Sequence, residues 1–350
     1  MSVLLSKKIF NKALNKKPKK INMKKFFKIS AIIFGILIVL LICGYAYINL
    51  KYPDVGPSPE MKISATPEML ERGKYLANSF AACMDCHSQR NYDKLGGPLV
   101  LGTEGKGGED FGEGAGYVPA KNITSDKETG LGNWTDGEIF RAITMGVDKN
   151  GEPLAPMMPY LYYRNMDEGD IRSIIAYIRT LSPIKNQIPE RKLNFPVNLI
   201  FRTLPSKPDF KKLPDPGNKL AIGEYYSGNC MGCHSPMEKG EFIQEKLFSG
   251  GVEFPNPKGG IVRSANISPD KETGIGSWTK EQFIQKFRSY KNPDIQNVSV
   301  KNGEFNTVMP WTFLANATDD DLGSVYDFLM TQKPIYSKVE KFSPAGTLEK

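Results

Sequence analysis

The hydrophobic positions of the chain form one long unbroken run and several shorter periodic runs. The long run, "ISAIIFGILIVLLICGYAYI" at residues 29–48, has no charged side chain and is long enough to cross a bilayer as a helix. The shorter runs follow the period of an amphipathic helix. Two of them close comparable stretches of chain, with apolar positions at Ile171, Ile174, Ile175 and Ile178, and at Leu322, Val325, Tyr326 and Leu329. The pattern predicts a helical protein with an apolar N-terminal segment.

Capping residues mark the starts of further helices. Thr66 followed by Pro67 is typical of an N-cap and a first helical position. Capping-box spacing appears twice, in Thr135 with Glu138 and in Thr279 with Gln282. Few segments alternate as strands do, and the stretches between helices are rich in Gly and Pro. We therefore expect an all-α fold with long loops.

The chain beyond residue 60 contains an internal duplication. "NITSDKETGLGNWT" at residues 122–135 matches "NISPDKETGIGSWT" at residues 266–279, and "MMPY" later matches "VMPW". Because the order of the motifs is kept, the sequence predicts two homologous domains of ordinary domain size. We call residues 63–183 repeat 1 and residues 215–335 repeat 2.

The segments outside the repeats are short and biased in composition. Seven prolines lie between residues 183 and 216, which indicates an extended linker, although its apolar "LNFPVNLIF" is expected to pack on a domain. The remaining predicted segments are a basic tail at 1–28, a transmembrane anchor at 29–49, a linker at 50–62, the Pro-rich linker at 184–214 and a C-terminal tail at 336–350.

The net charge of +8 comes from the N-terminal tail. Ten of the 46 basic residues lie in residues 1–28 with no acidic residue, which leaves 36 basic against 38 acidic residues in the rest of the chain. The folded part therefore has no excess of positive charge, and this distribution argues against a nucleic-acid binder. Lysines before the apolar run orient the N-terminus to the cytoplasm. A cleaved signal peptide ending near Ala46 is the alternative to an uncleaved anchor in the lipid bilayer.

Cysteine and histidine are scarce, and they are concentrated in two pentapeptides. The chain has five Cys and two His, and all but Cys43 lie in "CMDCH" and "CMGCH". Thiols at this spacing can bond to the two vinyl groups of a haem, and the following His can ligate its iron. The sequence therefore predicts two covalently bound haem c groups. Their attachment residues are Cys83, Cys86 and His87, and Cys230, Cys233 and His234.

Three other uses of these motifs are weaker. A zinc site would need four ligands together, whereas these motifs are far apart in the sequence. A thioredoxin-like C-x-x-C belongs to a βαβ pattern, which is missing nearby. Structural disulfides would leave both histidines unexplained.

The duplication also selects a second axial ligand for each iron. Neither repeat has a further His, and Met is the remaining common strong ligand. Met158-Pro159 and Met309-Pro310 stand in equivalent places ahead of the last helix, so we expect Met158 and Met309 to complete the two iron sites. Core packing is the alternative role for any single Met.

Further pairs of positions recur between the repeats. Gly73 and Gly223 are expected to let the first and last helices cross closely, against Tyr177 and Phe328. The Pro98 carbonyl in "LGGPL" is a candidate partner for Nδ1 of His87, with "SGGVE" as its counterpart. Trp134 and Trp278 are candidates for packing on a haem edge or simply in the core. The acidic "DKETG" loops are read as tight turns rather than cation sites.

Taken together, "CMDCH", "NITSDKETGLGNWT" and "MPY", with their second set and the linker's "LNFPVN", resemble membrane-associated class I-like dihaem cytochromes c. The resemblance covers roughly residues 65–335 and extends to the cytochrome c subunit family of bacterial alcohol and gluconate dehydrogenases. It implies two tandem cytochrome c domains on the periplasmic side of the bacterial inner membrane. It also implies redox partners: a dehydrogenase, an oxidase or a soluble cytochrome. That family usually carries three haem domains, whereas this chain has two and an anchor of its own.

Two function classes follow. Irons with both His and Met bound have no open position, which favours a pure electron carrier. A dihaem enzyme such as a peroxidase would need one iron with a labile Met. A redox sensor with the lysine tail as output is disfavoured because the tail is short and simple in composition.

Overall fold

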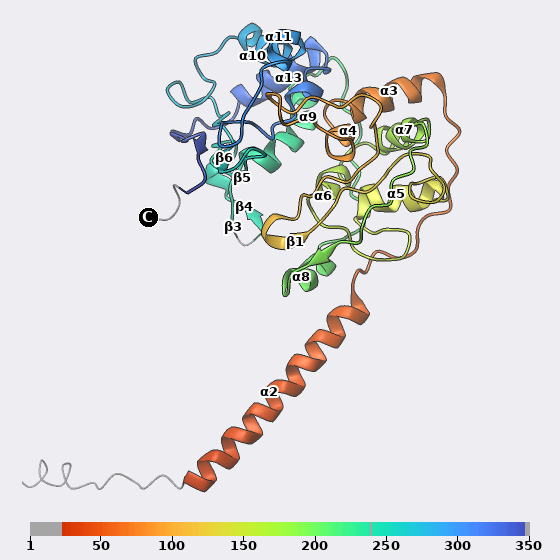
Figure 1. Cartoon of the computed structure of the whole chain (residues 1–350), viewed down its shortest axis with the longest axis vertical. Helices are drawn as coiled ribbons and strands as arrows, with labels where there is room; N and C mark the ends of the chain where they lie inside the picture. The colour runs from red at the N-terminus through yellow and green to blue at the C-terminus, as the bar shows by residue number, and fades with distance from the viewer. Residues whose placement is uncertain (1–22, 239, 347–350) are drawn as a thin grey trace, which may run out of the picture. The chain divides into compact units, whose positions relative to one another are not determined.

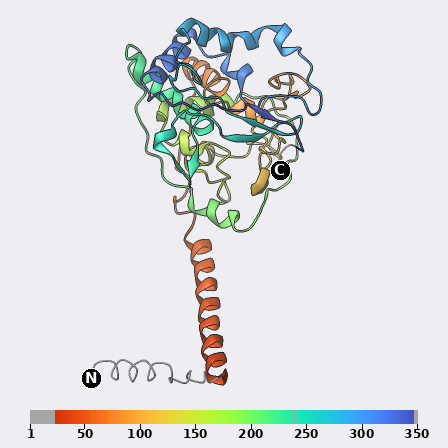
Figure 2. The same ribbon diagram turned by 90° about the vertical axis from the view of Figure 1, so that its left-hand side faces the viewer.

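The computed structural model describes residues 23–238 and 240–346, and the chain divides into two compact units between Tyr52 and Pro53 (Figure 1). The first unit contains α2 (Met23–Lys51), a single continuous helix with no buried residue (Figure 2). Within the part of the chain that the structure describes, α2 is the one helix long and apolar enough to cross a membrane. Most of the predicted basic tail lies outside the described residues.

The second unit holds both repeats. The helices of repeat 1 are α3 (Pro67–Ala77), α4 (Cys83–His87), α5 (Asp136–Met145), α6 (Tyr160–Tyr163) and α7 (Glu168–Ile178), with the 3-10 turn η1 (Glu113–Ala115). The linker contains α8 (Val197–Thr203). The helices of repeat 2 are α9 (Lys219–His234), α10 (Lys280–Arg288), α11 (Pro293–Gln296), α12 (Trp311–Leu314) and α13 (Asp319–Met330), with η2 (Gln244–Lys246) and η3 (Ser289–Lys291).

The expectation of an all-α fold is too strict, because three small antiparallel sheets accompany the helices in the described part of the chain. They pair β1 (Gly116–Tyr117) with β2 (Lys192–Leu193), β3 (Met237–Glu238) with β4 (Glu241–Phe242), and β5 (Glu253–Pro255) with β6 (Ile261–Arg263) and β7 (Phe342–Ser343). Strands of two or three residues are too short to show an alternating pattern, so they could not be predicted from hydrophobic periodicity. β7 belongs to the predicted C-terminal tail and ties it to repeat 2.

The first and last helices of each repeat cross at a glycine, as expected. A Cβ added to Gly73 of α3 would lie 1.8 Å from the carbonyl oxygen of Ser173 in α7 and 2.9 Å from Cβ of Tyr177. In repeat 2, a Cβ on Gly223 of α9 would lie 2.0 Å from the oxygen of Ser324 in α13. Only glycine allows backbones to approach this closely.

The predicted apolar stripes and caps are confirmed. The four isoleucines of α7 are buried, and so are Leu322, Val325 and Leu329 of α13. Both predicted capping boxes form, at the starts of α5 and α10. Thr66 caps α3 by accepting from the amide of Met69. Local propensity and burial therefore agree in these helices.

The Pro-rich linker is only partly extended. Its β2 strand pairs with β1 of repeat 1, so the predicted packing on a domain is found only at the start of the apolar run. The residues after it form α8, in which no residue is buried, and Phe195 and Ile200 are exposed. The apolar residues of "LNFPVNLIF" suggested that the segment packs on a domain, but the run is too short to show the period of a helix.

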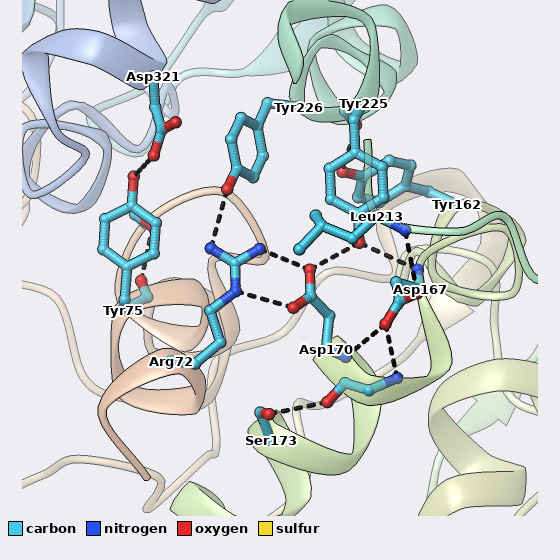
Figure 3. Close-up of polar contacts among 12 residues, drawn as sticks. Arg72, Tyr75, Tyr162, Asp167, Asp170, Ser173, Leu213, Tyr225, Tyr226 and Asp321 are labelled. Atoms are coloured by element: carbon cyan, nitrogen blue, oxygen red, sulfur yellow. Dashed lines mark hydrogen bonds and ion pairs between the residues drawn. The ribbon is translucent and has the colours of Figure 1, made fainter. Parts of the chain in front are cut away.

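The two repeats join through polar contacts between their first and last helices (Figure 3). Tyr225 of α9 donates to Asp170 of α7 at 2.7 Å, and Tyr75 of α3 donates to Asp321 of α13. Arg72 donates to Asp170 through Nε and Nη2 and to the Tyr226 hydroxyl through Nη1. The two repeats thus form one unit with a shared interface.

Candidate haem attachment sites

In repeat 1 the first predicted attachment motif forms its own short helix. α4 places Cys83 and Cys86 one turn apart, so their thiols lie on the same side of the helix. Helix α4 is separate from α3 and begins after Ala82, whose backbone is left-handed with φ of 50°. Tyr163 of α6 donates to the carbonyl of Ala81 at 2.5 Å and fixes the start of this turn.

In repeat 2 the same motif ends a long helix. α9 runs without a break from Lys219 through Cys230 and Cys233 to His234. The spacing explains the difference: Cys83 follows Gly73 by ten residues, whereas Cys230 follows Gly223 by seven. Seven residues are about two helical turns, so α9 can reach its motif without the interruption that the longer segment makes.

Both motif histidines are held by a backbone carbonyl. Nδ1 of His87 lies 2.7 Å from the oxygen of Lys121, and Nδ1 of His234 lies 2.7 Å from the oxygen of Ala265. A carbonyl can only accept, so Nδ1 carries the proton and Nε2 keeps its lone pair. Burial lowers the pKa of both imidazoles, against the opposing effect of these hydrogen bonds. Two neutral imidazoles with Nε2 available are what an iron site requires.

The expected role of the Pro98 carbonyl is wrong. That oxygen accepts from the amide of Asn91, and the partner of His87 comes from Lys121 instead. The expectation matched Gly96-Gly97 of repeat 1 to Gly250-Gly251 of repeat 2, but repeat 1 also contains the doublet Gly107-Gly108. The correct counterpart of Gly250 is Gly107, since each donates its amide to the carbonyl of the motif histidine, at 2.9 and 2.8 Å.

Gly107 and Gly250 also lie against the backbone carbonyls that accept from Nδ1 of the two histidines. Each has φ of +70°, and an added Cβ would lie 2.6 Å from the Lys121 oxygen or 2.5 Å from the Ala265 oxygen. Each glycine therefore packs directly on the carbonyl that holds the imidazole. The signal was present in the sequence as the doublets Gly107-Gly108 and Gly250-Gly251.

The long repeated motif explains why these carbonyls are well placed. Asn122 and Asn266 directly follow Lys121 and Ala265, are buried, and donate to the carbonyls of Ile184 and Ile335 at 2.7 and 2.8 Å. The motif is thereby tied to the chain that leaves the last helix of each repeat.

The acidic part of this motif forms the expected tight turns. Asp126 Oδ1 accepts from the amide and hydroxyl of Thr129, and Asp270 does the same with Thr273. Among residues 23–238 and 240–346, no three His, Cys, Asp or Glu side chains gather as a metal-ion site.

Met158 and Met309 have the same local geometry. Both are partly buried and pack against the hydrophobic core. In each case the amide two residues later, of Tyr160 or Trp311, donates to the Met carbonyl at 2.7 Å across the intervening proline. Met157 is more exposed, at 37%. The structure thus places the two predicted ligands in matching turns ahead of α6 and α12.

The environment of the thiols argues against a redox C-x-x-C pair. Burial raises the pKa of Cys83 and of Cys230 to about 12. Thiol–disulfide chemistry needs a thiolate, and catalytic C-x-x-C cysteines have lowered pKa values. Cys83 and Cys230 therefore lack the lowered thiol pKa that is typical of a redox C-x-x-C pair.

One buried ion pair next to the first motif was not predicted. Arg90 Nη1 lies 2.8 Å from Oδ1 of Asp85, inside the "CMDCH" motif, and the Arg90 side chain is only 2% exposed. Burial raises the pKa of Asp85, with Arg90 opposing that shift. Repeat 2 has Gly232 in the place of Asp85, so the pair is a feature of repeat 1.

The tryptophans differ between the repeats. Trp134 packs against the core with Lys149 over its ring, whereas Trp278 is 36% exposed. Trp134 therefore contributes to core packing, and Trp278 does so less.

The residues present fit a covalently attached haem at each motif. Each repeat offers two neighbouring thiols, a His whose Nε2 is available, and a Met in a matching turn. Two Cys, a His and a Met are together a residue set that would hold a c-type haem.

No protein-family model matches the chain. Individual relatives do. The chain is 26% identical over 294 residues to the cytochrome c subunit of a quinone alcohol dehydrogenase from Gluconacetobacter polyoxogenes, covering 78% of this chain and 58% of the relative. It is 26% identical over 281 residues to the gluconate 2-dehydrogenase cytochrome c subunit of Pantoea cypripedii, covering 76% and 60%.

A shorter relative is covered more fully. The chain is 29% identical over 270 residues to a dihaem cytochrome c-type protein of Cereibacter sphaeroides, covering 74% of this chain and 85% of the relative. The chain thus spans less than two thirds of the dehydrogenase subunits but most of the dihaem protein. The resemblance predicted from the motifs is confirmed: the chain is a homologue of the cytochrome c subunits of alcohol and gluconate dehydrogenases and of a dihaem cytochrome c.

Proposed function

We propose that the protein is an electron-transfer protein with two covalently bound haem c groups, one in each repeat. The observation that carries this proposal is the duplicated site: two C-x-x-C-H motifs, each with its His held through Nδ1, and two matching Met-Pro turns. When bound, such a haem supplies a one-electron carrier at the iron. Electron transfer needs no open coordination position, in agreement with a Met assigned to each iron.

The residues have separate roles in this proposal. Cys83 and Cys86, and Cys230 and Cys233, attach the two groups. His87 and His234 ligate the irons through Nε2, with Lys121 and Ala265 fixing the imidazole orientation. Met158 and Met309 would be the second ligands of the two irons, would exclude substrate from them and would raise their reduction potentials.

The packing of the repeats supports a relay between the two sites. Phe80, three residues before Cys83, stacks on Tyr226, four residues before Cys230, with ring centroids 4.0 Å apart. The Asn229 amide, next to Cys230, donates to the carbonyl of Phe80 at 2.8 Å. The segments that lead into the two motifs therefore touch, and the distance between the sites is set by direct packing.

The proposed place of the protein is the bacterial inner membrane. The apolar α2 with no buried residue supports an anchor, and lysines before it support a cytoplasmic N-terminus with the repeats in the periplasm. The names of the relatives support a dehydrogenase as electron donor. A respiratory-chain oxidase or a soluble cytochrome is the corresponding acceptor.

Haem quantification and optical spectra of the purified full-length protein test this proposal. We expect two haems per chain and two Met–iron(III) charge-transfer bands in the near infrared. Met158→Ala and Met309→Ala should each remove one band and leave the other. A high-spin iron in the unmodified protein, or one that binds cyanide readily, would contradict the pure carrier and favour a dihaem enzyme.

A further inference from the structure

The loop that carries Met309 is longer than its counterpart and is supported differently. Met309 follows Trp278 by 31 residues, whereas Met158 follows Trp134 by 24. The extra length in repeat 2 includes η3 and α11. Repeat 1 closes its shorter loop internally: the amide of Leu154 donates to Gly146 and the amide of Met158 donates to Ala155.

In repeat 2 this loop is bound to a segment of repeat 1. The amide of Leu95 donates to the Val298 carbonyl, and the amide of Val300 donates to the Asp93 carbonyl, both at 2.9 Å. Residues 93–95 and 298–300 therefore lie along each other as a short antiparallel pair, with a bridge between Lys94 and Ser299. The two segments are about 200 residues apart in sequence, so this contact is built only in the folded chain.

Asn306 is the centre of this contact. It is fully buried, and its Oδ1 accepts from the amide of Gly96 at 2.9 Å. Its Nδ2 donates to the carbonyls of Tyr92 and Lys94 at 2.8 and 3.0 Å. A buried amide side chain with its donors and acceptor paired fixes both partners, because leaving any of these groups unpaired is costly.

Arg90 extends the contact to the residue before Met309. Its Nε and Nη2 donate to the carbonyls of Gly97 and Gly96 at 2.8 and 2.6 Å. Its Nη1 donates to the Val308 carbonyl at 3.5 Å and pairs with Asp85 of the first motif at 2.8 Å. A continuous chain of contacts thus runs from the first attachment motif to the turn that holds Met309.

We propose that Asn306 is a positioning residue for the second iron: it fastens the Met309 loop to residues 90–97 of repeat 1, so that repeat 1 keeps Met309 on the iron of repeat 2. This inference rests on the function proposed above, in which Met309 is an axial ligand. Repeat 1 has Ala155 where repeat 2 has Asn306. The Met158 loop therefore has no counterpart of the Asn306 side-chain contacts.

The test compares Asn306→Ala with Asp93→Asn in the full-length haem-loaded protein. Asn306→Ala installs the residue that repeat 1 has at this position. Asp93→Asn is the matched control, because it removes the ion pair between Asp93 and Lys258 at the exposed edge of the same contact. The readouts are the near-infrared Met–iron(III) bands and cyanide binding to the oxidised protein.

We expect Asn306→Ala to weaken or remove one band and to raise cyanide affinity at one iron roughly ten-fold, the change that corresponds to about one net hydrogen bond. Asp93→Asn should change neither readout. Combining Asn306→Ala with Met158→Ala should leave at most the same weakened band, which assigns the effect to the second iron.

Unchanged bands and unchanged cyanide affinity in Asn306→Ala would overturn the proposal. An equal loss in Asp93→Asn would also overturn it, because general docking of the repeats would then be responsible. If Asn306→Ala fails to accumulate, Arg90→Lys replaces it, with the same expected loss at the second iron and the same contrary result. Met309→Ala alone distinguishes a failure of the proposed function, since two intact bands in that variant would mean that Met309 is not a ligand.

Discussion

The hydroxyl of Tyr225 donates to Oδ2 of Asp170 at 2.7 Å, and thereby joins the first helix of repeat 2 to the last helix of repeat 1. The reciprocal bond, from Tyr75 to Asp321, joins the first helix of repeat 1 to the last helix of repeat 2. Each tyrosine lies two residues after its crossing glycine and also accepts from a helix-capping amide, of Asp167 or Thr318. The two repeats therefore bind each other through the same pair of surfaces, as the subunits of a two-fold dimer do.

This symmetry gives a stability prediction for the interface. We expect Tyr225→Phe to lower the free energy of unfolding by about 1–3 kcal/mol, because Asp170 and the Asp167 amide each lose a buried hydrogen-bond partner. Tyr75→Phe should have a comparable effect on Asp321. Denaturant unfolding of the haem-loaded protein measures both. Tyr326→Phe, which removes a bond to the Trp278 carbonyl within repeat 2, is the control and should leave the inter-repeat contact intact.

The crossing of helices at glycine gives a second prediction. Gly223→Ala should lower the free energy of unfolding by at least about 1–3 kcal/mol, because the new methyl group would overlap the Ser324 carbonyl and push α9 from α13. Gly323→Ala in α13 is the control, since its added Cβ meets only side-chain atoms of Lys280 and Ile284, at 3.3 Å or more. Helix propensity alone favours that control substitution by about 1 kcal/mol. Equal effects of the two changes in thermal unfolding would show that the close crossing is not limiting.

The contrast between these glycines and Pro98 shows how far sequence reasoning reaches. The crossing glycines, the caps and the Met-Pro turns could be predicted because both repeats carry them at a nearly constant offset. The partner of His87 could not, because it is a backbone oxygen and any residue type supplies one. The residues inserted between Gly97 and Gly107 also concealed which glycine pair of repeat 1 is equivalent to the pair at Gly250. Asn306 carried no signal, since its partners come from the other repeat.

The turn at Asp270 gives a prediction about pH. Hydrogen bonds from the Thr273 hydroxyl and amide hold the pKa of Asp270 below its usual 3.8. A carboxyl whose pKa is lower in the folded state contributes stability above the unfolded value, and this contribution is lost as the pH falls through the folded value. We expect Asp270→Asn to be less stable than the unmodified protein at pH 7, with a difference that shrinks below about pH 4. Urea unfolding at both pH values checks this, and a constant difference would contradict it.

The separation of the chain at Tyr52 and Pro53 gives a prediction about the N-terminal segment. Residues 53–350 form a compact unit, and α2 has no buried residue. We expect residues 53–350, exported behind a cleavable signal sequence, to accumulate in the soluble periplasmic fraction with both haems and both near-infrared bands. The full-length protein should sediment with membranes. Loss of one haem or one band in the shortened protein would show that α2 contributes to the fold of the repeats.

The packing of Gly107 on Lys121 gives a prediction about one haem alone. In Gly107→Ala the new Cβ would lie 2.6 Å from the Lys121 oxygen, so this carbonyl must move away from Nδ1 of His87. A weaker hydrogen bond at Nδ1 makes the imidazole a poorer donor to iron(III). We therefore expect the reduction potential of the first haem to rise by tens of millivolts, where about 59 mV corresponds to a ten-fold change for a one-electron couple.

Gly108→Ala is the matched control for this change. Gly108 also has a positive φ, of +111°, so alanine strains the backbone there too, but its Cβ would meet only side chains of Ile188 and Asn186 at 3.7 and 3.8 Å. Potentiometric titration with optical detection should show one shifted haem in Gly107→Ala, the other in Gly250→Ala, and none in Gly108→Ala. A shift in Gly108→Ala of the same size would mean that loop strain, and not the orientation of the histidine, sets the potential.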